Sequence, residues 1–280
     1  MPEGHTLHRL ATDIRERFAR QVVSVSSPQG RFAESARLVD ETLLVDAQSY
    51  GKHLFVEFVE ARFVHVHLGL YGKFDLFDGE APPPVGQVRM RFVRRGTLPA
   101  YGDLRGATAC ELLTAGQRDE ILGRLGPDPL REDADWTRAW ERVARSRAPI
   151  GALLMDQAVL AGVGNVYRAE VLFRHRLHPL RPGNTLRRSQ FESLWHDLVV
   201  LMHEGVRTGR IDTVHVEHTP QTMGRAPRVD DHGGEVYVYR RHGLDCYVCG
   251  SRVRTEVLAT RNLFWCPRCQ PVFRSRARVR

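Results

Sequence analysis

Cys246-Tyr-Val-Cys249 and Cys266-Pro-Arg-Cys269 are two CxxC pairs separated by sixteen residues, and they decide how the last part of this chain folds. Two such pairs can place four thiolates tetrahedrally around one Zn²⁺ ion, each pair at the tip of a short turn. Disulfides or four unrelated thiols are the alternatives. Because the chain starts without a signal-peptide pattern and has one further cysteine, Cys110, the pairs predict a single structural zinc site.

The residues between the two pairs predict a β-hairpin. Arg252–Thr260 roughly alternates between polar and apolar side chains, and Leu263-Phe-Trp265 follows it. A hairpin of this size is too small to have an apolar core of its own. We therefore expect bound zinc to supply much of its folding free energy.

Positive charge is concentrated around this hairpin. Residues 240–280 contain ten arginines and two acids, Asp245 and Glu256, which gives a net charge of +8. The whole chain also carries +8, so residues 1–239 are neutral overall. A solvated charged surface is the simplest explanation, but guanidinium groups on a rigid turn match the oxygens of phosphate. The distribution indicates nucleic acid as the partner.

The composition is that of a globular protein with room for two domains. The chain has 280 residues, of which 42% are hydrophobic, and no uncharged apolar run approaches the length of a membrane span. We expect a monomeric cytoplasmic protein without membrane segments. Of its 41 basic residues, 39 are arginine and only Lys52 and Lys73 are lysine. A lysine kept in such a chain indicates a task that needs a compact or titratable ammonium group.

The first half predicts one helix followed by strands. Leu7, Leu10, Ile14 and Phe18 form a single apolar stripe at helical spacing. Stretches typical of β-strands follow at 22–26, 43–49, 54–59, 63–68, 87–94 and near 107–111, with glycines and prolines between them. This pattern predicts a β-sandwich or barrel in a domain over residues 1–125, followed by a turn-rich linker at 126–134.

The second half predicts helices before the hairpin. One helix is expected at Trp136–Arg145, a second begins at Pro149, and a third follows the glycine-rich turn Gly162–Asn165. A fourth is expected to be capped by Asn184-Thr185 and to end at Gly205. We assign 135–235 to a helical domain and 236–280 to the zinc hairpin with its basic tail, which makes the chain an α+β protein.

The turn Gly162–Asn165 has two possible roles. A glycine-rich turn that leads into a helix directs backbone N–H groups and the positive end of the helix dipole toward an anion. It can equally be a corner where glycines let two helices approach closely. Together with the arginine-bearing hairpin in the same half, a phosphate-binding role is favoured.

The second residue predicts a reactive amine. Removal of Met1 would leave Pro2 as an N-terminal secondary amine, and an α-amine titrates near pH 8, so an appreciable fraction is unprotonated at neutral pH. Such an amine can attack a sugar C1′ or an aldehyde to form an iminium ion. The adjacent Glu3 can donate or accept a proton.

Taken together, these segments resemble the formamidopyrimidine-DNA glycosylase/endonuclease VIII family over nearly the whole chain, and its endonuclease VIII branch more closely. The segments that carry the resemblance are Pro2-Glu3-Gly4, Gly51-Lys52-His53-Leu54, Leu70-Tyr71-Gly72, 125–129, 155–157, Leu160–Glu170 and Thr260–Gln270. The resemblance implies an N-terminal helix and β-sandwich, then a helical domain with a helix–two-turn–helix motif and a β-hairpin zinc finger.

The resemblance also implies the chemistry. The protein would be a bifunctional DNA glycosylase and AP lyase of base excision repair that removes oxidised bases, preferentially pyrimidines, from damaged double-stranded DNA without a nucleotide cofactor. Pro2 would be the nucleophile that forms the Schiff base, Glu3 would protonate the sugar ring oxygen, and Lys52 would contact the phosphate beside the lesion. Elimination would then cleave the strand on both sides of the sugar.

For DNA binding, the resemblance implies contacts from both halves. Asn165 and Arg261 would bind the phosphates that flank the lesion, and Glu170 matches an acid near the pocket. Leu70 and Tyr71 would fill the gap left by the everted base.

The chain departs from the family pattern at three places. His5-Thr6 stands where Pro-Glu is usual, Gly151 replaces a basic residue, and Gly69 replaces the glutamine of the wedge. Two alternatives follow: a damage- or structure-binding protein without turnover, and a lyase that acts mainly on abasic sites. A Schiff base on Lys52 in place of Pro2 is a third possibility.

His65 and His67 alternate with valines and so face the same side of a predicted strand. A metal site on these two histidines is disfavoured because the sequence shows no third ligand.

Overall fold

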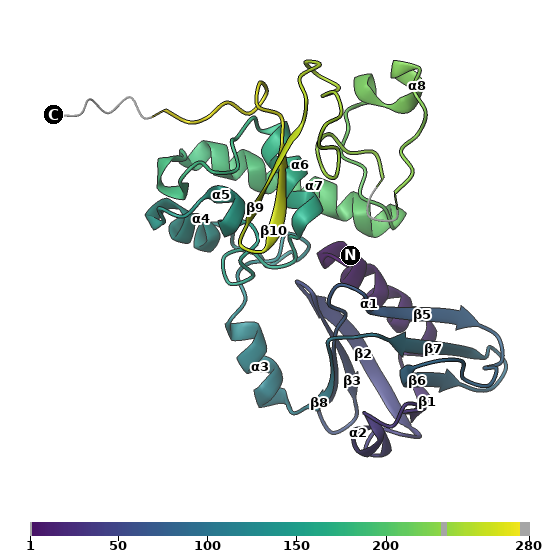
Figure 1. Ribbon diagram of the computed structural model, residues 1–280. Helices are drawn as coiled ribbons and strands as arrows, with labels where there is room; N and C mark the ends of the chain where they lie inside the picture. Colours follow the sequence, from purple (N-terminus) through teal and green to yellow (C-terminus); the bar gives the residue numbers. More distant parts are fainter. Residues whose placement is uncertain (1, 231–233, 275–280) are drawn as a thin grey trace. The chain divides into compact units, whose positions relative to one another are not determined.

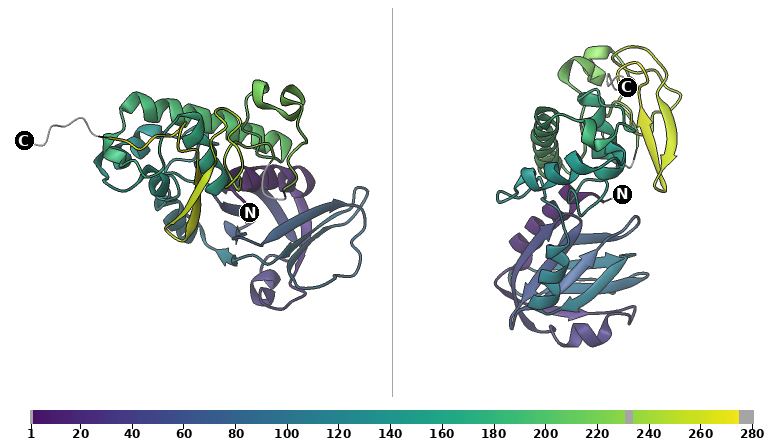
Figure 2. Two further views of the ribbon diagram at one scale, coloured as in Figure 1. Left: turned by 45° about the horizontal axis from the view of Figure 1, so that its top comes forward. Right: turned by 90° about the vertical axis from the view of Figure 1, so that its left-hand side faces the viewer.

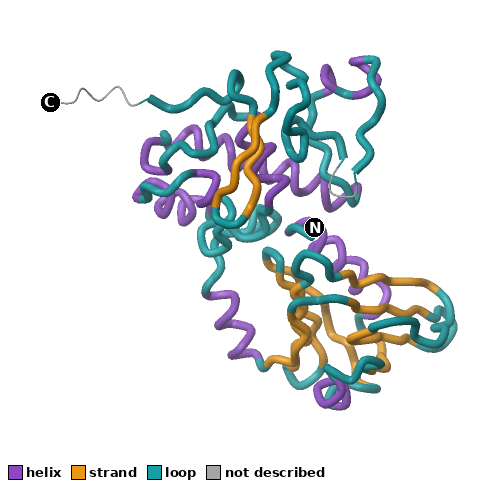
Figure 3. Tube along the Cα trace, in the orientation of Figure 1, coloured by secondary structure: helices purple, strands orange, loops and turns teal. Residues whose placement is uncertain are grey.

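The structure is a computed structural model that describes residues 2–230 and 234–274 (Figures 1 and 3). The chain divides into two compact units, Met1–Leu125 and Gly126–Arg280. The further division of the second unit at residue 235 stays a prediction. Among the described residues, no helix combines the length and the apolar character needed to cross a bilayer.

The first unit begins with helix α1 (Gly4–Phe18), as its apolar stripe predicts. Leu7, Leu10, Ile14 and Phe18 are all buried. The helix gives way to β1 through Arg20, whose φ of 62° turns the chain sharply.

Eight strands follow in one continuous antiparallel order, β5-β7-β6-β1-β2-β3-β4-β8. Their bounds are β1 Gln21–Ser26, β2 Thr42–Tyr50, β3 His53–Phe58, β4 Arg62–His67, β5 Lys73–Asp78, β6 Val88–Arg94, β7 Ala100–Arg105 and β8 Ala109–Leu113. The first half of β1 pairs with β2 and its second half pairs with β6, so this strand passes from one layer to the other. The predicted β-sandwich is confirmed.

The core of this unit is formed by α1 and both layers of the sandwich. The ring of Phe92 on β6 lies edge-on to Phe18 of α1 and to Phe58 of β3, each with centroids 6.0 Å apart, and 5.4 Å from Phe74 of β5. Such edge-to-face contacts add to the free energy gained by burying the rings. Phe92 thus joins the helix to the two layers.

The sequence did not predict β5 and β7, because acidic residues interrupt their apolar pattern. Asp103 in β7 is buried, and its carboxylate accepts hydrogen bonds of 2.6 and 2.7 Å from Nε and Nη2 of Arg91 on β6. A buried carboxylate is tolerated when a guanidinium pairs with both of its oxygens. The partner lies on another strand, where local patterning cannot reveal it.

Two short helices of this unit were also not predicted, α2 (Ala33–Arg37) and α3 (Ala115–Gly123). Helix α3 begins with a capping box in which the Thr114 hydroxyl accepts from the Gln117 backbone, and the Gln117 side chain accepts from the Thr114 backbone. Its Ile121 and Leu122 pack on a small apolar cluster around Phe55 and Phe63, on the side of the sheet away from the main core.

The second unit is helical. Its elements are α4 Trp136–Arg145, α5 Ile150–Leu153, α6 Asn165–Arg174, the 3₁₀ turn η1 Gly183–Thr185, α7 Arg188–Thr208, η2 Val216–His218 and α8 Pro220–Met223. Helix α4 has the predicted bounds. Helix α6 is buried along almost its whole length, from Asn165 to Phe173.

The predicted limits of the long helix α7 are wrong at both ends. Asn184-Thr185 does not cap it, because the Thr185 hydroxyl donates to the carbonyl of Pro182 within η1, and the helix begins four residues after Asn184. Gly205 remains inside the helix, and the end is set by Gly209, whose φ of 73° suits a left-handed C-cap.

The zinc hairpin consists of β9 (Arg254–Leu258) and β10 (Arg261–Trp265), drawn in yellow in Figures 1 and 2. The two strands pair antiparallel, with Arg261 opposite Leu258. Phe264 and Cys266 lie in the same apolar core as the helices. The hairpin therefore shares a core with the helical part, so zinc is not the sole source of its stability.

Candidate functional site

Helix α1 runs antiparallel to strand β2. Near the end of the helical segment, the Arg20 backbone N–H donates to the carbonyl of Leu44 at 2.7 Å. One helical turn or more back toward the N-terminus, Arg15 donates through Nη2 to the carbonyl of Ala47, also at 2.7 Å. The start of α1 therefore lies at the same end of the sandwich as the end of β2.

This direction places the predicted catalytic residues at one end of the sandwich. Pro2 and Glu3 directly precede α1, and Lys52 lies in the two-residue turn that follows β2. Gly51, the first residue of that turn, has a φ of 59°, a conformation that glycine adopts without strain. Pro2 and Lys52 are half-buried and Glu3 is buried.

The predicted wedge lies at the same end. Leu54 of β3 pairs with Val66 of β4, so the end of β4 lies beside the start of β3 and the turn that carries Lys52. The wedge loop follows β4 directly. In this loop Leu70 is 38% exposed and Tyr71 is 87% exposed. Such high exposure is unusual for an aromatic side chain that has no binding function.

The wedge loop explains one departure from the family pattern. Gly69 has a φ of 69°, and a Cβ atom there would lie 1.9 Å from the hydroxyl oxygen of Thr108. A glutamine cannot occupy this position in the present conformation. At Gly72, an added Cβ would lie 2.3 Å from the carbonyl oxygen of Leu68. The loop thus presents Leu70 and Tyr71 from a backbone that is closely packed on both sides.

A histidine cluster lies next to this end of the sheet, and the sequence revealed only part of it. The His65 Nδ1 atom lies 2.9 Å from a Glu111 carboxylate oxygen, and its Nε2 lies 2.9 Å from Nδ1 of His53. If His65 donates to the carboxylate, it must accept from His53. The ring of His67 lies 5.1 Å from that of His53. Burial lowers the pKa of His53 to about 3, so its imidazole is neutral at pH 7.

The glycine-rich turn before α6 is held by a glutamine. Gln157 donates through Nε2 to the carbonyl of Val163 at 3.0 Å, and its Oε1 accepts from the Gly162 backbone, also at 3.0 Å. Gly162 itself has a φ of 87°. These bonds make the turn a rigid lead into α6 and set the position of Asn165, the first residue of that helix.

Arg168 connects Asn165 to the zinc hairpin. Its guanidinium, on α6, is 1% exposed and donates through Nη2 to the side-chain oxygen of Asn165 and, at 3.0 Å, to the carbonyl of Asn262. Nη1 donates to the carbonyl of Gly151 at 3.2 Å. Asn262 follows Arg261 on β10, so one buried side chain contacts both predicted phosphate-binding elements. Sequence patterning gave no indication of this role.

Arg261 follows a strained turn. The hairpin turn is formed by Ala259 and Thr260, which have φ values of 47° and 63°. Two positive φ values are usual for a two-residue hairpin turn, but asparagine and glycine normally occupy them, and a β-branched residue there is an outlier. Strain of this kind is often found beside functional groups. Here it fixes where β10, and with it Arg261, begins.

Glu170 does not lie on a surface that could contact DNA directly. Its carboxylate is fully buried and accepts from the backbone N–H groups of Tyr237, Val238 and Tyr239 at 2.6 to 2.9 Å. The hydroxyl of Thr213 donates a fourth bond at 2.7 Å. The structure therefore gives Glu170 an anchoring role, in which it fastens residues 237–239 to α6 ahead of the zinc hairpin.

The four predicted zinc ligands come together. The sulfur atoms of Cys246, Cys249, Cys266 and Cys269 all lie within 4.8 Å of one another. The pairs Cys246–Cys269 and Cys249–Cys266 are 3.9 and 3.4 Å apart, close to the separation of about 3.8 Å expected for sulfurs placed tetrahedrally at about 2.3 Å from zinc. The residues fit a Cys₄ zinc site. Among the described residues, no other group of three His, Cys, Asp or Glu ligands meets this spacing.

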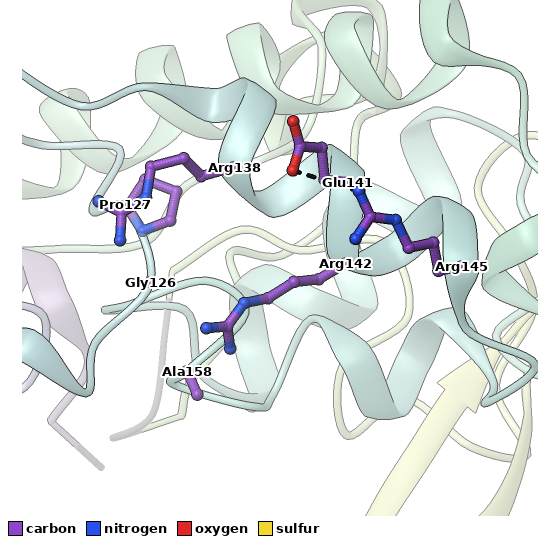
Figure 4. A pocket seen from close by; sticks show the side chains of 7 residues that line it. All are labelled: Gly126, Pro127, Arg138, Glu141, Arg142, Arg145 and Ala158. Atoms are coloured by element: carbon purple, nitrogen blue, oxygen red, sulfur yellow. Dashed lines mark ion pairs between the residues drawn. The ribbon is translucent and has the colours of Figure 1, made fainter.

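An arginine-lined cavity of about 380 Å³ lies on α4 (Figure 4). Its lining residues are Gly126, Pro127, Arg138, Glu141, Arg142, Arg145 and Ala158. Glu141 pairs with Arg145 at 3.5 Å, and no ion pair of Arg138 or Arg142 occurs within the described part of the chain. One wall is fixed by the bond from the Gly126 N–H to the carbonyl of Gln157 at 2.9 Å. The cavity therefore borders the segment that contains Gln157, the residue whose side chain holds the turn before Asn165.

Comparison with known proteins identifies three successive parts of the chain. Family models match the N-terminal domain of formamidopyrimidine-DNA glycosylase over residues 1–110, its H2TH domain over 125–216, and the zinc finger found in FPG and IleRS over 243–272. A chain with a β-sandwich, a helix–two-turn–helix motif and a Cys₄ hairpin in this order belongs to the class of DNA glycosylases that is built from these three parts.

Within that class the chain is similar to endonuclease 8 1 of Mycobacterium tuberculosis, with 53% identity over 96% of this chain and 100% of the relative. The formamidopyrimidine-DNA glycosylase of Thermosynechococcus vestitus is 30% identical over 95% and 92% of the two chains. The chain therefore belongs to the formamidopyrimidine-DNA glycosylase/endonuclease VIII family and is endonuclease VIII-like.

Solved structures agree with the fold. The MutM (Fpg) protein of Thermus thermophilus superposes with a TM-score of 0.73 at 27% identity, over 96% of this chain and 98% of that one. Lactococcus lactis Fpg, crystallised with DNA that contains an AP site, gives 0.76 at 21% identity over 96% and 100%. The predicted α+β architecture with its zinc finger is thereby confirmed.

Proposed function

We propose that this protein, a DNA glycosylase and AP lyase of base excision repair by its family, removes oxidised pyrimidines from double-stranded DNA and cleaves the strand through a Schiff base on Pro2. The observation that carries the proposal is the convergence of Pro2, Glu3, Lys52 and the wedge loop at one end of the sandwich. It acts as a monomer in the cytoplasm, where the bacterial chromosome lies, and needs no nucleotide cofactor.

The chemistry begins at Pro2 after Met1 is removed. The unprotonated amine forms a bond to the sugar C1′ while the bond from C1′ to the base breaks, and the base leaves with the electron pair. The nitrogen then loses its proton, which neutralises the departing base. Glu3 donates a proton to the ring oxygen, and ring opening gives an iminium ion between Pro2 and C1′. Loss of a C2′ proton then expels the 3′ phosphate, and a second elimination expels the 5′ phosphate.

Lys52 serves this reaction as a cation. An ammonium group can contact a phosphate as a compact point charge where a planar guanidinium would need more room. This accounts for a lysine at a functional turn in a chain that otherwise uses arginine. The imidazole of the neighbouring His53 is neutral at pH 7, so it adds no positive charge beside Lys52.

The wedge and the second unit hold the DNA. Leu70 and Tyr71 enter the duplex and replace the everted nucleotide in the stack. Asn165 and Arg261 bind phosphates near the lesion. Arg138 and Arg142 offer two further guanidinium groups, which extend phosphate binding along the strand from the turn that carries Asn165.

Borohydride trapping on a duplex with an abasic site tests the nucleophile. We expect a covalent adduct that Pro2→Gly abolishes and Lys52→Ala retains. An adduct that depends on Lys52 instead would move the Schiff base to that residue, and the absence of any adduct with wild-type protein would favour a DNA-binding protein without turnover. The mass of the purified protein provides the control, because a retained Met1 blocks the amine.

An excision panel tests the substrate. Matched duplexes that carry an oxidised pyrimidine, an oxidised purine or an abasic site should be cleaved at different rates, with the oxidised pyrimidine preferred over the purine. Cleavage of the abasic duplex alone would support a lyase that acts on abasic sites, and faster release of the purine would contradict the proposed specificity.

A further inference from the structure

Two elements that contact phosphate in the proposed function meet at a single buried side chain. Arg168 donates to the side-chain oxygen of Asn165 and to the backbone carbonyl of Asn262, the neighbour of Arg261. These two acceptors belong to α6 and β10, and the second lies ninety-four residues away from Arg168 in sequence. Arg168 is 1% exposed; its bond to Asn165 is buried and its bond to Asn262 is partly buried.

The bond to Asn165 decides which end of its amide faces outward. A side-chain amide has one oxygen that accepts and one nitrogen that donates. With Arg168 on the oxygen, the nitrogen is the part left for another partner, and it makes no hydrogen bond to the described residues. A phosphate group can only accept hydrogen bonds. Arg168 therefore holds Asn165 in the orientation that suits an anion.

The bond to Asn262 acts on the hairpin. Because the carbonyl of Asn262 is held from α6, the start of β10 cannot shift along the helix without breaking a partly buried hydrogen bond. The strained turn at Ala259 and Thr260 leaves Arg261 little freedom on its other side. A third bond, from Nη1 to the carbonyl of Gly151, adds α5 to the same junction.

Gly151 joins the junction through its backbone. A Cβ atom at residue 151 would lie 3.0 Å from the carbonyl oxygen of Pro179 and 3.3 Å from Leu263. A side chain at this position would press on the Pro179 backbone and on Leu263, and only the carbonyl of Gly151 takes part in the junction. The positive charge at this junction is the guanidinium of Arg168 on α6.

We propose that Arg168 is a positioning residue that couples the two phosphate contacts, so that Asn165 and Arg261 bind DNA as one unit. This inference rests on the proposed DNA-binding function. If Arg168 only satisfied buried polar groups, its loss would lower stability and leave the two contacts independent of each other. If it couples them, its loss changes how their effects combine.

A double-mutant cycle distinguishes these cases. Dissociation constants for a duplex with an abasic-site analogue are measured for Asn165→Ala, Arg261→Ala and the double variant, in wild-type and Arg168→Met backgrounds. In the wild-type background, the loss in the double variant should fall short of the product of the single losses by at least about threefold. In the Arg168→Met background, the single losses should multiply. Zinc content and thermal unfolding confirm that each variant is folded.

A second comparison leaves Arg168 in place. Asn165→Asp keeps an oxygen for Arg168 and turns the contact into an ion pair, but presents a carboxylate to the phosphate. We expect it to unfold at a higher temperature than Asn165→Ala while binding DNA at least tenfold more weakly than that variant. An Asp variant that unfolds at or below the temperature of the Ala variant would contradict the orientation.

The outcomes separate the inference from the function. If neither Asn165→Ala nor Arg261→Ala weakens DNA binding, the proposed phosphate contacts are wrong. If both weaken it and the deviation from the product is the same with and without Arg168, the contacts stand and the coupling is wrong.

Discussion

The two units hold their candidate functional groups in different ways. In the sandwich, Lys52, Leu70 and Tyr71 lie on turns at the end of an apolar core, and tight glycine turns set their positions. In the second unit, Asn165 and Arg261 are positioned from within, by Arg168 and by a Cys₄ site. Function and stability are therefore separable in the first unit and linked in the second. Variants in each unit test whether function and stability are separable in the first unit and linked in the second.

Loss of the metal should affect only the second unit. Cys249→Ser removes one thiolate, and because metal binding supplies folding free energy to small sites, we expect loss of zinc and a decrease in DNA affinity of more than about 100-fold. The sandwich should keep its secondary structure. Metal analysis, fluorescence anisotropy and circular dichroism measure the three quantities. Unchanged DNA affinity in a variant without zinc would show that the hairpin does not bind DNA.

Replacing one charged residue in each unit should lower stability in the second unit and slow strand cleavage in the first. Glu170→Ala leaves three backbone N–H groups and a hydroxyl without their acceptor, so it should lower the free energy of unfolding by about 3 to 5 kcal/mol. Lys52→Ala, on a turn, should change stability by less than about 1 kcal/mol while it slows strand cleavage. Denaturant unfolding and cleavage rates of the two variants form the comparison. A marginal effect of Glu170→Ala on stability would refute the anchoring role.

Acid should destabilise the sandwich first. Burial, followed by the charges of His65, His67, Arg124 and Lys52, lowers the pKa of His53 to about 3. Burial also lowers the pKa values of His65, which Glu111 partly offsets, and of His67. Between pH 6.5 and about 3 the unfolded chain binds protons that the folded chain does not, so stability is lost as the pH falls through this range.

In the second unit the corresponding loss comes at lower pH. Burial opposes ionisation of Asp197, but hydrogen bonds and charge from His175 and Arg174 outweigh it and lower its pKa to about 2. Stability from this carboxylate is present above its unfolded value near 3.8 and is lost as the pH falls toward 2. Burial also lowers the pKa of His178 in this unit.

The tryptophans make this difference measurable. All four lie in the second unit, at Trp136, Trp140, Trp195 and Trp265. During acidification we expect circular dichroism to report loss of β-structure by about pH 4, before the tryptophan fluorescence changes, with a loss for the sandwich on the order of 2 kcal/mol. His53→Asn should shift the first transition to lower pH. Coincident transitions would argue against the histidine cluster as the cause.

The smallest effect is expected at the arginine-lined cavity on α4. If Arg138 and Arg142 each contact a phosphate, replacing both by glutamine should reduce the slope of log affinity against log salt by about 1.8 on a long duplex. Arg207→Gln with Arg210→Gln is the matched control, since it removes the same charge from residues that lie outside the cavity and pair with Glu204 and Asp212. Equal slopes for both double variants would exclude specific contacts at α4.

Local patterns predicted much of this molecule. The stripe of α1, the bounds of α4 and the four zinc ligands follow from helical spacing and from cysteine chemistry, which act over a few residues. Strand β7 is not predicted, because an aspartate such as Asp103 is typical of exposed positions. Its burial depends on the ion pair with Arg91, which only the folded structure shows. The cap at Asn184-Thr185 was wrong because Thr185 bonds within a 3₁₀ turn instead.

The residue order alone established the family, the zinc ligands and the predicted reactive residues at the N-terminus, because each is written in a short contiguous segment. Only the tertiary structure decided that Glu170 is an anchor, that His53 completes a cluster with His65, and that Arg168 joins Asn165 to the hairpin. The physical reason is that buried polar groups are satisfied by partners far away in sequence, sixty-seven to sixty-nine residues for Glu170 and ninety-four for Arg168. No local pattern records such a partner until the chain has folded.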